Sequence, residues 1–163
     1  MTDLLTTPLP ATASIGPRGF GGWLVIPILG LIITPPFALY SLGTTVVPLF
    51  EAAVRQAVFA RPPLLLMVGV ELVGSFVMLV LSAICLVRSK QRSSKFPSLM
   101  ITFLCVNFVV HLSNAATTIW YYDSIGMSPP SGAGQGGFGT LLAVLVWVPY
   151  FIKSKRVKNT FVK

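Results

Sequence analysis

This sequence is poor in charge, in acids and in reactive side chains. Only 10% of its 163 residues are Asp, Glu, Lys or Arg, whereas a soluble domain usually carries about 25%. It has four acids, two cysteines and one histidine, too few convergent ligands for a metal or haem site, and it contains no nucleotide-binding or catalytic motif. We therefore expect no metal and no other cofactor, and the composition argues against a soluble enzyme.

The sequence is instead rich in long apolar stretches. Hydrophobic residues make up 54% of the chain, its mean hydropathy is +0.82, and four apolar stretches cover residues 22–42, 63–87, 97–121 and 137–152. A membrane-spanning helix needs roughly 17–25 residues, and the fourth stretch reaches that length if Lys153 and Lys155 snorkel to the interface. The pattern predicts an all-α polytopic membrane protein, a four-transmembrane-helix bundle at residues 19–163, after a disordered tail at residues 1–18.

The basic residues predict the orientation of these spans. Ten of the 12 Lys and Arg lie before the first stretch, between the second and third, or after the fourth; only Arg55 and Arg61 lie in the other loops. The positive-inside rule then places both termini and the central loop in the cytoplasm. The first stretch follows no basic run and ends in no small-residue cleavage site, so we expect a retained span and not a signal peptide.

The formal net charge of +8 is explained by this topology, and we expect no nucleic-acid partner. Basic side chains beside helix ends attract anionic lipid head groups at the cytoplasmic face. They could also dock a membrane-protein partner. The residues assigned to this role are Arg88, Lys90, Arg92, Lys95, Lys153, Lys155, Arg156 and Lys158.

Prolines interrupt the first stretch, and a short amphipathic segment follows it. Pro35 and Pro36 each remove a backbone donor and clash with the preceding turn, so we expect a kink, or a break into two half-helices, at residues 34–37. This kink or break would either pack against the rest of the protein or act as a hinge or a functional site. Residues 48–60 predict an amphipathic helix on the outer surface, with Glu51 and Arg55 able to pair four residues apart. It would cap the bundle or dock a partner.

The chain ends with a second amphipathic pattern. Tyr150, Ser154, Val157 and Phe161 recur at helical spacing, and basic residues lie between them. We expect a helix that leaves the membrane and either anchors to lipid or docks a partner. The glycine-rich loop at residues 131–137 follows no strand and precedes no GK[ST] motif, so it is a flexible linker and not a phosphate site.

Polar residues inside the spans form the candidate site. Glu71 is the one acid within a span, about eight residues or roughly 12 Å from the outer surface, where a charge costs at least a few kcal/mol. His111 lies at a similar depth in the next stretch, and the short connecting loop favours antiparallel neighbours. We expect contact between them, directly or through one water. Residues at helical spacing extend this to a buried polar network of Glu71, Ser75, Asn107, His111, Asn114 and Thr118.

This network has three possible roles. It can be structural, because hydrogen bonds between membrane helices contribute about 0.6–2 kcal/mol each. It can be a proton or ligand site built on Glu71 and His111, or it can contact a partner subunit. A hydrolase would need a nucleophile activated by a nearby base; Ser75 beside Glu71 has no specific spacing for this.

Two motifs carry a resemblance to a known family. GGWLV at residues 21–25 and WVPYFIKSKRVKNTF at residues 147–161 resemble the YdgK-like family of small four-span bacterial inner-membrane proteins, a domain of unknown function. The resemblance covers residues 19–162 and implies an inner-membrane setting. It implies no activity, substrate or catalytic residue.

Three functions remain after these observations. The first is a non-enzymatic accessory or scaffolding subunit that associates with a larger inner-membrane complex. The second is a small transport or proton-coupled unit, with a homo-oligomer possible, that uses Glu71 and His111. The third is an integral-membrane enzyme.

Overall fold

The structure is a computed structural model that describes residues 21–162, and every regular element in that range is a helix. The tail predicted at residues 1–18 lies outside the described residues. The elements in chain order are η1 (Gly22–Leu24), α1 (Val25–Val46), η2 (Val47–Phe50), α2 (Ala52–Ala60), α3 (Pro62–Lys90), α4 (Phe96–Ser124), α5 (Gln135–Lys153) and α6 (Lys155–Thr160), where η marks a 3₁₀ helix.

Four of these helical segments are long and apolar enough to cross a membrane. They contain the four predicted apolar stretches, and the shortest, α5, has 19 residues. At 1.5 Å per residue it is about 28 Å long, close to the roughly 30 Å hydrocarbon thickness of a bilayer. The all-α, four-span fold class is confirmed.

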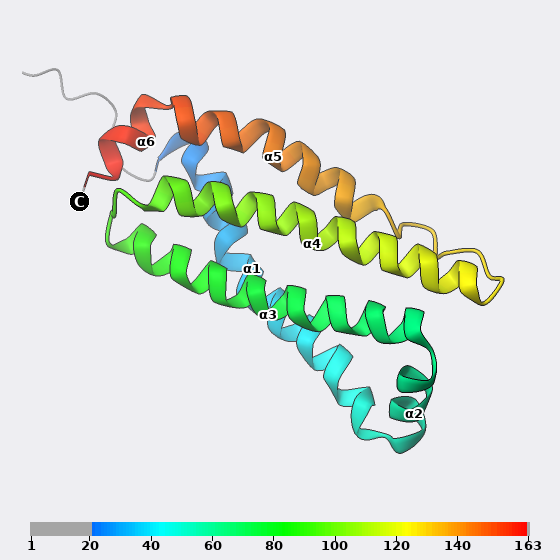
Figure 1. Cartoon of the computed structure of the whole chain (residues 1–163). Coiled ribbons are helices and arrows are strands. Elements are labelled where there is room, and N and C mark those ends of the chain that lie inside the picture. The colour runs from blue at the N-terminus through cyan, green and yellow to red at the C-terminus, as the bar shows by residue number, and fades with distance from the viewer. Residues whose placement is uncertain (1–20, 163) are drawn as a thin grey trace, which may run out of the picture.

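The long helices pack one against the next in the order α1, α3, α4, α5, and they do not form a closed bundle (Figure 1). α3 packs against α1 on one side and α4 on the other, and α5 packs against α4; in the described chain α1 makes no comparable contact with α4 or α5. We call the end where residues 21–25 and 150–162 lie the termini end, and the opposite end the α2 end (Figure 1). Toward the α2 end, α1 diverges from α4, so these two helices are separated there.

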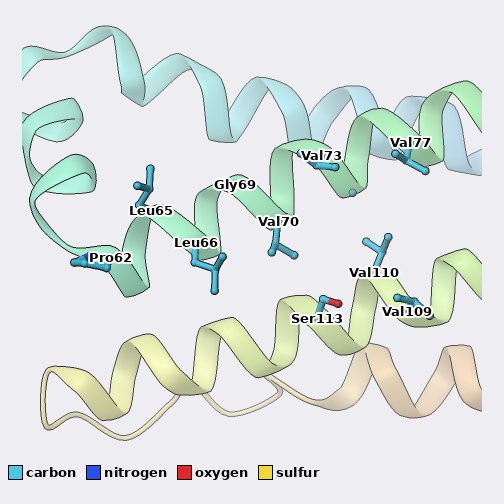
Figure 2. A pocket seen from close by; sticks show the side chains of 11 residues that line it. Pro62, Leu65, Leu66, Gly69, Val70, Val73, Val77, Val109, Val110 and Ser113 are labelled. Atoms are coloured by element: carbon cyan, nitrogen blue, oxygen red, sulfur yellow. The ribbon is translucent and has the colours of Figure 1, made fainter.

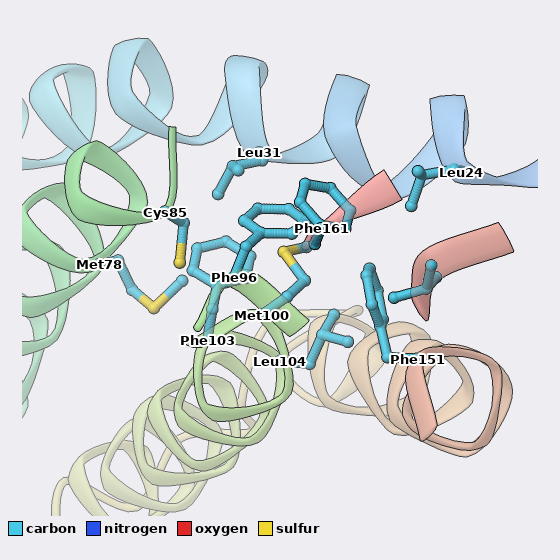
Figure 3. Packing of buried hydrophobic residues seen from close by; sticks show 11 residues of the cluster. Leu24, Leu31, Met78, Cys85, Phe96, Met100, Phe103, Leu104, Phe151 and Phe161 are labelled. Carbon is cyan, nitrogen blue, oxygen red and sulfur yellow. The ribbon is translucent and has the colours of Figure 1, made fainter. Parts of the chain in front are cut away.

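A cluster of buried hydrophobic residues joins the helices toward the termini end (Figure 3). Phe96, at the start of α4, is fully buried, with its ring centre 4.4 Å from that of Phe161 and 6.1 Å from that of Phe151. Aromatic pairs at such distances add to the stabilisation from area burial. The buried cluster comprises Leu24, Leu31, Met78, Cys85, Phe96, Met100, Phe103, Leu104, Phe151, Val157 and Phe161.

The C-terminal segment belongs to this core, which corrects one expectation. Ser154 has an extended backbone (φ −67°, ψ 120°) that ends α5, and the Val157 N–H donates to its hydroxyl oxygen at 3.4 Å to begin α6. Val157 and Phe161 are therefore buried within the protein. The prediction of one helix that leaves the membrane to meet lipid or a partner is wrong, because its apolar side is covered by the chain itself.

The prolines of α1 do not divide it. α1 is one 22-residue helix with Pro35 and Pro36 inside it, so the predicted break into two half-helices is not formed. Membrane helices tolerate proline where nearby hydroxyl groups and neighbouring helices compensate the backbone. Here α3 packs along α1.

The predicted amphipathic helix is present as α2. It packs on η2 and α3, with Val58 buried, so it lies at one corner and does not cap the whole bundle. Glu51 and Arg55 make no ion pair within 4 Å. Instead, the Glu51 backbone carbonyl accepts the Arg55 N–H at 3.0 Å, as the first hydrogen bond of the helix.

Candidate functional site

A cavity of about 490 Å³ opens where α1 separates from α4. We call it the crevice. Its floor is α3 and its walls are α1 and α4, so three spans contribute side chains. The lining residues are Ile33, Thr34, Phe37, Ala38 and Ser41 of α1, Glu71, Ser75 and Met78 of α3, and Asn107, Val110, His111 and Asn114 of α4.

The Glu71 carboxylate joins the three helices that line the crevice. Its Oε1 accepts a hydrogen bond from the Ser41 hydroxyl of α1, and its Oε2 accepts one from the Asn114 side-chain amide of α4 at 2.6 Å. The Ser75 hydroxyl, one turn along α3, lies 3.3 Å from the same Oε1 and 3.1 Å from the Ser41 oxygen. The carboxylate is therefore held by donors from every wall.

All of these donors are neutral. Within residues 21–162, no Lys, Arg or His nitrogen lies within 4 Å of the Glu71 carboxylate. An ionised carboxylate can only accept hydrogen bonds, and an uncompensated charge in a membrane is costly. The crevice therefore holds a carboxylate that has hydrogen bonds but no counter-charge.

The network is also short of donors. The side-chain oxygen Oδ1 of Asn114 is buried and has no hydrogen-bond partner, although the amide nitrogen of the same side chain is bonded to Glu71. A buried acceptor without a partner costs about 1–3 kcal/mol. An occupant that brings N–H groups into the crevice would meet a carboxylate with spare acceptor capacity beside this unpaired amide.

The structure brings together part of the predicted polar network. Glu71, Ser75 and Asn114 are hydrogen-bonded as one group, and Asn107 lines the same crevice. Thr118 does not line it. Ser41 was missed; the only available signal was that it is the single serine of α1.

The predicted direct contact between Glu71 and His111 is not formed. Both side chains line the crevice, but Asn114 takes the place expected for the histidine. The His111 ring lies beside Gly136 of α5, where an added Cβ would be 3.0 Å from Nδ1, and His111 is exposed in the isolated chain. Similar depth does not fix rotation, because residues three apart on a helix point about 60° away from each other around its axis.

The predicted lipid-binding or partner-docking residues lie at or near the termini end, in the last turn of α3, in the α3–α4 loop, at the end of α5 and in α6. Seven of the eight are exposed. Arg156 differs: its guanidinium lies against Gly21 and Gly22, where an added Cβ would be 3.1 Å away. Gly22 also has a φ of +66°, which favours glycine. Arg156 thus packs α6 against the first residues of the described chain.

The described residues contain no cluster of potential metal ligands. Between residues 21 and 162, no three His, Cys, Asp or Glu side chains come together as ligands. Cys85 is buried in the core and Cys105 is exposed on α4, and both are free thiols.

Comparison with known proteins gives one match. The profile of a family described as a protein of unknown function, DUF2569, matches residues 17–162. No curated protein and no solved structure matches the chain. The match supports the broader part of the resemblance noted in the sequence, a domain of unknown function over nearly the whole chain, and it does not extend to the YdgK-like name.

Proposed function

Because the chain belongs to the DUF2569 family, whose description gives no activity, we propose its role from the crevice: it is a non-enzymatic accessory subunit that receives a membrane-spanning helix of a larger complex. The supporting observation is the Glu71 carboxylate, which has three neutral donors and no counter-charge. A partner helix that carries a Lys or Arg side chain would supply that charge and donate further hydrogen bonds to the carboxylate.

The shape of the crevice supports a helix as its occupant. Its walls are two long helices, and its lining includes apolar side chains of both, Ile33 and Phe37 of α1 and Val110 of α4, beside the polar residues of the floor. Small hydrogen-bonding residues and close packing are what associate helices in membranes. In the isolated chain most of each span is uncovered, and α5 is the least buried, so the protein has ample surface for a larger assembly.

The proposed setting is the bacterial inner membrane with both termini in the cytoplasm. The support is the positive-inside rule, applied to the basic residues of the α3–α4 loop and of α6. α2 and the crevice then belong to the periplasmic half. Alkaline phosphatase fused after Lys95 should be inactive, and the same reporter fused after Ser131 should be active; the reverse result would overturn the orientation.

Site-specific photo-crosslinking tests the occupant. Phe37 and Phe76 are both exposed spanning phenylalanines, but only Phe37 lines the crevice. Replacing each with benzoylphenylalanine in living cells should give one discrete protein adduct at position 37 and none at position 76. Adding Glu71→Gln should weaken the adduct severalfold, because the carboxylate would no longer attract a cationic side chain.

Three outcomes would count against this role. Equal adducts at positions 37 and 76 would show non-specific contact, and an absence of protein adducts at position 37 would remove the partner helix. An adduct at twice the chain mass of 17.5 kDa would identify a second copy, and the protein would then be a homo-oligomer. An adduct that contains a larger membrane protein and depends on Glu71 supports the proposal.

A small transport unit is the second candidate, favoured by the polar lining of the crevice. Asn107 and His111 face the cavity without hydrogen bonds to the Glu71 group, so they are free to bind a solute. Purified protein in liposomes should then carry a flux that Glu71→Gln or His111→Ala abolishes. A flux that survives both substitutions would remove these residues from any transport mechanism.

A further inference from the structure

A second cavity, of about 610 Å³, lies between α3 and α4, and we call it the groove. Figure 2 shows Leu66 and Val70 of α3 pointing toward Val110 and Ser113 of α4. Glu71 lies on a different side of α3, about 150° around the helix axis from the middle of the groove-lining face. The lining residues are Pro62, Leu65, Leu66, Gly69, Val70, Val73, Gly74, Val77, Val109, Val110 and Ser113.

Two glycines shape the groove in opposite ways. At Gly74, an added Cβ would lie 2.7 Å from a methyl carbon of Val110, so α3 and α4 touch there and form the floor. At Gly69, an added Cβ would meet no atom within 4 Å, so the groove is open at this point. A slender apolar group can lie along this channel without displacing either helix.

The groove is long enough to hold an acyl chain across one leaflet of a bilayer. It follows α3 from Pro62 to Val77, about 22 Å at 1.5 Å per residue. One leaflet contributes about half of a hydrocarbon core that is roughly 30 Å thick. An extended acyl chain that enters at the α2 end therefore fits within the groove along its length.

Positive charge lies where the groove begins. Arg61 immediately precedes Pro62, and Arg55 lies in α2, which packs on α3. Both arginines are exposed, and neither has an ion-pair partner among residues 21–162. Guanidinium groups bind phosphate oxygens with two parallel hydrogen bonds, and this end of α3 is where lipid phosphates would lie.

We propose that the groove is a phospholipid site, in which one acyl chain lies along α3 and the phosphate is bound by Arg61. The apolar lining would bind the acyl chain, and the groove is long enough to hold it. The unpaired guanidinium would bind the phosphate of the headgroup. The groove shares one lining residue with the crevice, Val110, and the other lining residues differ, so the proposal does not depend on what occupies the crevice.

Native mass spectrometry of protein extracted in a mild detergent tests the site. The wild-type chain should retain one phosphatidylglycerol when this lipid is added back to delipidated protein. Gly69→Leu should abolish retention, because Gly69 lines the groove, the new Cβ meets no atom within 4 Å, and the rest of the side chain would occupy groove space. Gly30→Leu is the matched control: Gly30 also has no atom within 4 Å of an added Cβ and lines neither cavity, so lipid retention should be unchanged.

The headgroup is tested by chemistry and by a second variant. Wild-type protein should retain phosphatidylglycerol about tenfold better than diacylglycerol with the same chains, the scale of one charge-assisted hydrogen bond. Arg61→Gln should remove that preference. Equal retention of the two lipids by the wild type would overturn the phosphate site.

The acyl-chain site has its own decisive outcomes. Lipid that stays bound to Gly69→Leu would place the chain elsewhere, and equal loss in Gly69→Leu and Gly30→Leu would show a general effect of added side-chain volume. The absence of any retained phospholipid in the wild type would also overturn the proposal. Unfolding midpoints measured with and without added phosphatidylglycerol distinguish a lost site from a misfolded variant. A folded variant that lacks the site should have a normal midpoint that does not rise when the lipid is added, whereas a misfolded variant should have a lowered midpoint.

Discussion

The contact between α3 and α4 at Gly74 predicts that a single methyl group destabilises the fold. In Gly74→Ala the new Cβ would lie 2.7 Å from Val110 Cγ1, about 0.7 Å closer than the 3.4 Å at which ordinary contact begins. Val110 is β-branched, and a β-branched side chain in a helix has few rotamers in which to retreat. Overpacking of this kind costs about 1–3 kcal/mol.

Gly69→Ala provides the matched control on the same helix. Both substitutions gain up to about 1 kcal/mol of helix propensity, but only Gly74→Ala meets a neighbour. The difference between the two free energies of unfolding therefore isolates the packing cost and should be about 1–3 kcal/mol. It can be measured by SDS-induced unfolding in mixed micelles, followed by tryptophan fluorescence.

A double variant makes this test specific to the α3–α4 contact. Val110→Ala removes the methyl groups that the new Cβ would meet, so Gly74→Ala should cost less when Val110→Ala is already present. Residues in contact show interaction free energies of about 0.5–3 kcal/mol. Equal stability of Gly69→Ala and Gly74→Ala, or strict additivity with Val110→Ala, would refute the close approach.

Three further substitutions or modifications test other parts of the structure. Glu71→Gln should lower the free energy of unfolding by about 1–3 kcal/mol, because it puts an amide against neighbouring donors. A double-mutant cycle with Asn114→Leu should show coupling between the two positions, and additive losses of stability would argue against the Glu71–Asn114 hydrogen bond. In detergent-solubilised protein, a maleimide should modify Cys105, which is exposed on α4, faster than Cys85, which is fully buried, and unfolding should remove the difference; equal rates before unfolding would contradict the core. Phe161→Ala should cost about 3–5 kcal/mol, since the ring is stacked in the aromatic cluster, and an unchanged unfolding midpoint would show that the C-terminal segment is not docked.

Sequence reasoning located the floor of the crevice but not all of its walls. Glu71 was singled out because it is the one acid in a span, and helical spacing connected it to Ser75. Helical spacing within the next span added Asn114 to the same network. Ser41 could not be found in this way, because its role depends on how α1 crosses α3, and periodicity within one helix carries no information about that crossing.

The absence of a direct Glu71–His111 contact has the same origin. Counting residues from the membrane surface gives depth, and depth was similar for Glu71, His111 and Asn114. The choice between the last two is made by rotation of α4 about its axis, which the α3–α4 contact at Gly74 and Val110 helps to fix. His111 consequently lies beside Gly136 of α5.

Local chemistry alone determined the four spans and α2. Hydropathy over about 20 residues sets where a chain can cross a bilayer, because every backbone polar group there must be bonded within its own helix. The tertiary structure decided what depends on segments far apart in the chain. It set the return of α6 onto Phe96, the continuity of α1 through its prolines, the crevice and the groove, because each results from how side chains of different helices fit together.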